Sequence, residues 1–64
     1  MNNNTKLEIA VEIMAAKIAK STREGIKPED ERMKKLLDEK IKMYQGDMET
    51  INKIIEVYGK EFKI

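Results

Sequence analysis

The sequence predicts a small all-α protein with three helices in a single domain. Its 64 residues are enough for one domain. Apolar residues recur every three or four positions along most of the chain, as on the buried face of a helix. Two short stretches, "TREGIKP" (22–28) and "GD" (46–47), carry residues that end and start helices. We therefore expect one domain over residues 1–64, with helices at about 6–21, 28–45 and 48–62.

The first predicted helix follows a polar segment, residues 1–5, which we expect to be frayed. Thr5 and Glu8 have the spacing of a capping box, in which each side chain binds a free backbone amide of the first turn. The apolar residues that follow have 4-3-4 spacing and stack on one face. This core stripe is Leu7, Val11, Met14 and Ile18.

A second apolar patch on this helix, made of Ile9, Ile13 and Ala16, points almost directly away from the core stripe. A helix that is apolar on opposite faces is usually covered on both. Either the two other helices cover both faces, or the patch meets another chain. Because the chain has so few helices, we favour the second interpretation. It makes these three residues a candidate oligomer interface.

The second predicted helix follows a loop in which Gly25 suits the left-handed position that ends a helix. Pro28 suits the first turn of the next helix, where its missing N–H costs nothing. The inner face of this helix is predicted to hold Met33, Leu36, Leu37, Met43 and Tyr44, with Ile41 at its edge. Lys40 falls in the middle of this face. We favour a lysine whose methylenes pack while its ammonium reaches water over one in a buried ion pair.

Gly46 and Asp47 decide whether the chain folds back on itself. A 4-3 repeat of apolar residues continues from residue 37 to residue 62 without a break, which is typical of one long coiled-coil helix over 28–62. Glycine and aspartate are poor residues inside a helix, but they are good at its end and at its start. We therefore favour a turn, with residues 28–45 and 48–62 forming an antiparallel helical hairpin.

Gly59 leaves two alternatives for the end of the third helix. It ends the helix early, or it lies inside the helix and lets another backbone approach closely. We favour a helix that continues through Gly59 and frays beyond it.

The composition limits the chemistry that the chain can perform. It has no cysteine and no histidine, which excludes disulfides and removes the usual ligands of structural zinc. The commonest general base and the best nucleophile are also missing. The single serine, Ser21, has no evident base beside it. We expect no catalytic residue, no metal and no cofactor, and therefore no enzymatic activity.

The charge and hydropathy pattern predicts a soluble, cytoplasmic protein. Thirteen basic and twelve acidic residues give a net charge of +1. No apolar run approaches the length of a transmembrane helix, so we expect no membrane contact. Glu8 and Glu12 interrupt what would be the apolar part of a signal peptide. In general look, a Lys/Glu-rich helical chain ending in "YGKEFKI" resembles small bacterial proteins, but no motif in it implies a function.

Protein–protein interaction is the function that this pattern favours. A small domain without disulfides or metals is usually stabilised by a partner subunit, so we expect self-association as a homodimer or a higher oligomer. We expect an adaptor, regulator or inhibitor.

A DNA-associated regulator is the alternative. Its candidate anion or nucleic-acid contacts are Lys17, Lys20, Arg23 and Lys27, which we call the basic cluster. No aromatic residues interleave them, and the acidic start of the second helix would repel phosphates. Nucleic-acid binding is therefore the weaker prediction.

Overall fold

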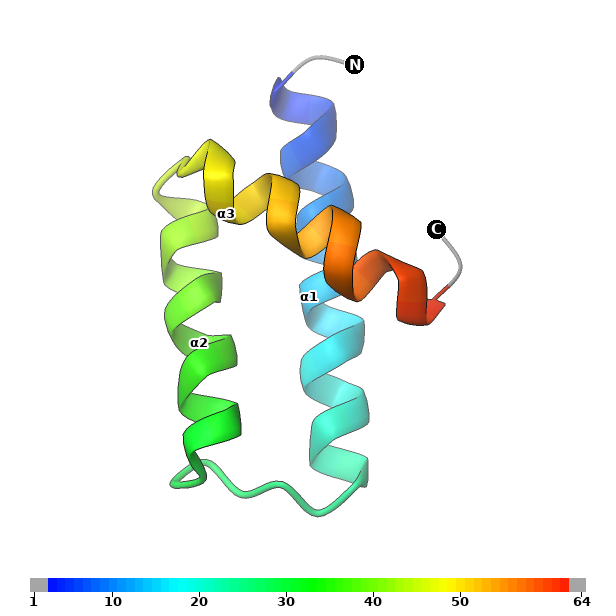
Figure 1. The fold of residues 1–64 in the computed structure, drawn as a ribbon, viewed down its shortest axis with the longest axis vertical. Helices are drawn as coiled ribbons and strands as arrows, with labels where there is room; N and C mark the ends of the chain where they lie inside the picture. Colours follow the sequence, from blue (N-terminus) through cyan, green and yellow to red (C-terminus); the bar gives the residue numbers. More distant parts are fainter. Residues whose placement is uncertain (1–2, 63–64) are drawn as a thin grey trace.

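The computed structural model describes residues 3–62 as an all-α fold, which confirms the predicted fold class (Figure 1). Helices α1 (Asn3–Arg23) and α2 (Glu31–Tyr44) lie side by side and run in opposite directions. The third helical segment consists of α3 (Met48–Lys53), the π-helical η1 (Ile54–Tyr58) and the 3-10 helical η2 (Gly59–Phe62). It crosses one side of the α1–α2 pair obliquely. Among residues 3–62 there is no strand.

Helix α1 is longer at both ends than the sequence predicts. It is already helical at Asn3, so Thr5 lies inside it and does not cap it. The prediction of a frayed segment is wrong for residues 3–5, and its first two residues lie outside the described part of the chain. At the other end the helix continues past Ser21 to Arg23. It then ends through Gly25, whose φ of 87° is the left-handed conformation expected there.

Helix α2 begins after Asp30, not at Pro28 as the sequence predicts. The Asp30 side chain accepts a hydrogen bond of 2.8 Å from the backbone N–H of Arg32. A helix with Pro28 in its first turn would have Lys27 as its N-cap, and lysine has no acceptor for the free amides. The carboxylate of Asp30 supplies that acceptor three residues later.

The turn between α2 and α3 confirms the predicted break at Gly46. This residue has φ 83°, and its N–H donates to the Met43 carbonyl at 3.0 Å. The next N–H, of Asp47, donates to the Lys42 carbonyl at 3.1 Å, which completes a left-handed helix end. The Asp47 side chain then caps α3 by accepting from the Glu49 N–H at 3.2 Å. One continuous coiled-coil helix over 28–62 is therefore excluded.

Gly59 lies inside the third helical segment and does not end it. Its φ is −59°, and its N–H donates to the Ile54 carbonyl five residues back, which is the π-helical pattern. A Cβ atom at this position would lie 3.2 Å from Cδ1 of Ile13. The absence of a side chain lets the third segment approach α1 closely, as in one of the two alternatives that the sequence left open.

The core lies where α1, α2 and the third segment meet. Its apolar members are Ala10, Ile13, Met14, Met33, Leu36, Met43, Ile51, Ile54 and Tyr58. Ile13 has no exposed surface. The candidate oligomer interface is therefore wrong for Ile13, because the third segment covers that face of α1. Ile9 packs against the same core and is half-buried, and Ala16 keeps partial exposure.

The inner face of α2 is also rotated relative to the prediction. Met33, Leu36 and Met43 are buried as expected, but Leu37 and Tyr44 are exposed. The third segment crosses α2 on the side of Glu39, which becomes buried instead. Because of this rotation, one apolar edge of α2 faces away from the core, and Ile41 lies on that edge.

Candidate interaction surface

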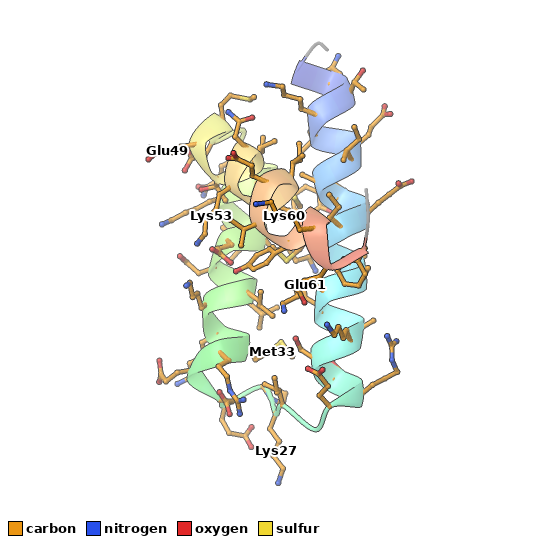
Figure 2. The ribbon with its side chains drawn as sticks, turned by 45° about the vertical axis from the view of Figure 1, so that its right-hand side comes forward. Lys27, Met33, Glu49, Lys53, Lys60 and Glu61 are labelled. Atoms are coloured by element: carbon orange, nitrogen blue, oxygen red, sulfur yellow. The ribbon has the colours of Figure 1, made fainter. Side chains whose placement is uncertain are left out.

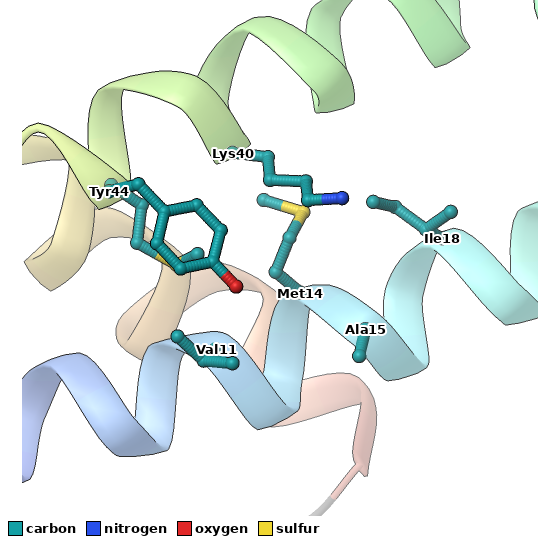
Figure 3. A pocket seen from close by; sticks show the side chains of 7 residues that line it. Val11, Met14, Ala15, Ile18, Lys40 and Tyr44 are labelled. Carbon is teal, nitrogen blue, oxygen red and sulfur yellow. The ribbon is translucent and has the colours of Figure 1, made fainter.

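A pocket lies between α1 and α2 on the side of the pair that the third segment leaves uncovered. Its volume is about 190 Å³. Its lining residues are Val11, Met14, Ala15, Ile18, Lys40, Met43 and Tyr44, all of them from α1 and α2 (Figure 3). On α1, Ala15 points almost opposite to Ile13, the residue that meets the third segment. The pocket is therefore a groove on the far side of the helix pair.

Lys40 and Tyr44 reach from α2 toward α1 across this groove (Figure 3). Lys40 is exposed, and its ammonium forms no ion pair with any residue in the described range 3–62. Its methylenes line the pocket beside Met14. The methylenes of Lys40 therefore pack while its ammonium stays unpaired, which is the arrangement that the sequence favours.

An exposed apolar stripe continues outward from the groove along α2. The exposed fraction is 38% for Leu37, 57% for Ile41 and 58% for Tyr44. Their 4-3 spacing places them on one edge of the helix. We define the open face as the groove and this stripe together: Val11, Ala15 and Ile18 of α1 with Leu37, Lys40, Ile41 and Tyr44 of α2.

Acidic side chains border the open face on α1. Glu8 and Glu12 lie on the exposed edge of this helix, about two turns and one turn before Ala15, respectively. Neither forms an ion pair with a residue that the structure describes. The open face is therefore apolar at its centre, with an unpaired cation on α2 and unpaired carboxylates along α1.

The structure brings together only two members of the basic cluster, and it pairs them with one carboxylate. Glu61 of η2 lies 2.8 Å from Lys17 Nζ and 3.0 Å from Lys20 Nζ. Hydrogen bonds from these lysines, with that from Lys17 the stronger, lower the pKa of Glu61. Arg23 and Lys27 are exposed and form no ion pair within residues 3–62, and Lys27 projects from the loop, away from Glu61 (Figure 2).

The two paired lysines also contact the aromatic rings of the third segment. Lys17 Nζ lies 5.4 Å from the centre of the Tyr58 ring, and Lys20 Nζ lies 5.9 Å from that of Phe62. Such contacts are attractive because the face of an aromatic ring is electronegative. Together with Glu61 they hold η1 and η2 against α1. Half of the basic cluster thus contributes to the fold.

A second pocket, of about 240 Å³, lies beside these lysines. Its lining residues are Lys17, Ser21, Glu24, Ile26, Arg32, Lys35, Leu36 and Tyr58. Two of its three cations already have carboxylate partners, because Arg32 binds Asp30 through two hydrogen bonds of 3.0 and 2.8 Å. Those hydrogen bonds from Arg32 lower the pKa of Asp30 to about 2. Little positive charge is left here for an external anion.

Glu39 is a buried charged residue that the sequence analysis missed. It is 6% exposed. The Tyr58 hydroxyl donates to its Oε1 at 2.6 Å, and Lys53 Nζ donates to its Oε2. Burial, followed by the hydrogen bond to Glu39, raises the pKa of Tyr58 well above its usual range. A signal was present in the sequence, since Glu39 lies three residues after Leu36 and four before Met43, on the buried stripe of α2.

Neither a metal site nor a hydrogen-bonded serine–base pair is formed among the described residues. No group of three acidic side chains in residues 3–62 is placed to hold a metal ion. Ser21 is buried in the last turns of α1, and its hydroxyl forms no hydrogen bond with a carboxylate or amine in this range. Within the same range, none of the helices combines the length and the apolar character that crossing a bilayer requires. The open face is the strongest candidate for a functional surface.

Comparisons with known proteins give no family to which the chain can be assigned. Neither the protein-family models, nor the curated proteins, nor the solved structures contained a match. The function is therefore proposed from the geometry of the open face.

Proposed function

We propose that this protein acts by binding another protein through its open face, as a small non-enzymatic adaptor, regulator or inhibitor in the cytoplasm. One observation carries the proposal: Leu37, Ile41 and Tyr44 continue an apolar groove at helical spacing, although the core does not need them. Single exposed apolar residues are common on proteins. A contiguous set bordering a groove is typical of an interaction site.

The shape of the open face suits a helical partner. An amphipathic helix binds a groove between two helices by inserting apolar side chains at positions i, i+3 or i+4, and i+7. Burying a side chain as large as Ile41 contributes about 1.5–3 kcal/mol. Tyr44 adds a hydroxyl that can donate a hydrogen bond at the edge of such a contact, and tyrosine is among the residues that contribute most to interfaces.

The alternative function, nucleic-acid binding by the basic cluster, has less support. Lys17 and Lys20 would have to leave Glu61 before they contacted phosphates. Arg23 and Lys27 remain as exposed cations, and two phosphate contacts supply little affinity.

Photo-crosslinking in the native cells tests the proposal. A photoreactive amino acid replaces Ile41 in one version of the protein and Val57 in a control version. Val57 is a matched control because it is 51% exposed but lies on η1, away from the open face. We expect a discrete crosslinked product from position 41 and none from position 57. No product from position 41, or the same products from both positions, would refute the proposed function.

A further inference from the structure

We infer that the partner of the open face is the open face of a second copy of this chain, related by a two-fold axis parallel to α1 and α2. This inference rests on the proposed function and names its partner. The two-fold axis places α1 of each copy opposite α2 of the other. The four helices then form an antiparallel bundle with the third segments on its two outer sides.

Complementary side-chain sizes support this arrangement. The outer edge of α1 carries the small, exposed residues Ala15 and Ala19, whereas the facing edge of α2 carries large apolar side chains. Ala15 and Lys40 line the same pocket, so they lie at the same level along the helix pair. A two-fold axis parallel to the helices preserves this level. Ala15 of one copy therefore meets the turn from Lys40 to Tyr44 of the other, where its small side chain leaves room for Ile41.

The same side-chain sizes select the orientation of the axis. A two-fold axis perpendicular to the helices would place α2 against α2 and bring large side chains against large ones. The parallel axis instead places the alanines of α1 against the large side chains of α2.

The available area suits a weak but specific dimer. At the exposed fractions of Leu37, Ile41 and Tyr44, the three side chains together leave roughly 300 Å² for burial, given about 150–250 Å² for a large side chain. With the α1 residues of the open face, two copies together bury about 1,000 Å², the lower limit for a specific interface. We therefore expect a dissociation constant in the micromolar range. The dimer would also supply the stabilising partner that a small domain without disulfides or metals needs.

Sedimentation equilibrium of the purified full-length chain tests the inference. We expect the unmodified chain to dimerise, and Ile41→Glu to weaken the dimer by about 100-fold or more, because it buries a carboxylate in an apolar contact. Val57→Glu, the matched control, should leave the dimer unchanged. Circular dichroism should show the same helicity for all variants, since Ile41 and Val57 are both more than half exposed.

Engineered disulfides test the orientation independently of these variants. The natural chain has no cysteine, so Ala15→Cys and Ile41→Cys each introduce a single thiol. When the two variants are mixed, one of them isotope-labelled, and oxidised, we expect mass spectrometry to find mainly the mixed disulfide. A dominant disulfide between two Ile41→Cys chains would show the perpendicular axis and overturn the inference.

Two further outcomes would overturn the inference without touching the proposed function. The first is an unmodified chain that stays monomeric into the millimolar range, and the second is a dimer insensitive to Ile41→Glu. In either case, crosslinking from position 41 to a protein of different mass would still support binding of another partner through the open face. If position 41 gives no crosslink in cells, the proposed function fails as well.

Discussion

Replacing Gly46 by alanine tests the turn on which the whole fold depends. Gly46 has φ 83°, and a Cβ atom added there would meet no other atom within 4 Å. The substitution therefore causes no clash, and its cost is that of the backbone conformation alone. A left-handed conformation costs an L-residue about 1–2 kcal/mol, and the stiffer unfolded chain returns part of this. We expect a net loss of about 1 kcal/mol, which lowers the melting temperature of a domain of this size by roughly 4–8 °C.

Thermal unfolding followed by the helical circular dichroism signal measures this loss. Gly46→Asn is the matched control, because asparagine tolerates the left-handed conformation better than alanine does. The expected order of melting temperatures is glycine, asparagine, alanine. If residues 28–62 formed one continuous helix, alanine would stabilise it by about 1 kcal/mol relative to glycine. A higher melting temperature for Gly46→Ala would therefore refute the turn.

Three further predictions concern buried contacts and acid stability. Tyr58→Phe removes the hydroxyl that donates to the buried Glu39 carboxylate, so urea unfolding should show a loss of about 1–3 kcal/mol; an unchanged midpoint would contradict this hydrogen bond. Ile13→Ala should cost about 2–4 kcal/mol because Ile13 is fully buried, and Ile9→Ala should cost clearly less; equal losses would mean that the third segment does not cover Ile13. The pKa of Glu61 is lowered by its lysine partners, so its stabilising effect is present above the usual value of 4.5 and is lost as the pH falls below it. Glu61→Gln should accordingly flatten the fall in melting temperature below pH 4.5, and identical pH profiles would count against these ion pairs.

The helix ends could be predicted from the sequence because they depend on local chemistry. A left-handed glycine followed by a capping aspartate is recognisable over a few residues, and the structure has both at Gly46 and Asp47. The start of α2 shows the limit of this reasoning. Pro28 and Asp30 both carry a start signal, and only the side-chain hydrogen bond to the Arg32 amide distinguishes them.

The buried faces of the helices could not be predicted in the same way, because they depend on where the third segment crosses. Hydrophobicity alone places Leu37 and Tyr44 inside and Glu39 outside, whereas the structure has the reverse. Burying the Glu39 carboxylate becomes favourable only when Tyr58 and Lys53, distant in sequence, donate to it. Periodicity along one helix contains no information about such partners.

The crossing of the third segment also explains why the open face lies on a different side of α1 from the candidate interface that the sequence predicts. The sequence predicts two apolar faces on α1 and too few helices to cover both. The sequence pattern does not show which face is covered, because it does not reveal that Gly59 lets the third segment approach Ile13 closely.

The face left open is therefore the one formed by Val11, Ala15 and Ile18 with α2. Lys17 and Lys20 are held by Glu61 on the covered face, whereas Lys40 lies in the groove, unpaired within residues 3–62. In the proposed dimer, the small side chains of Ala15 and Ala19 on one wall fit the large apolar side chains on the facing wall of the second copy. This fit between the two walls of the open face is the physical basis for expecting the chain to recognise itself.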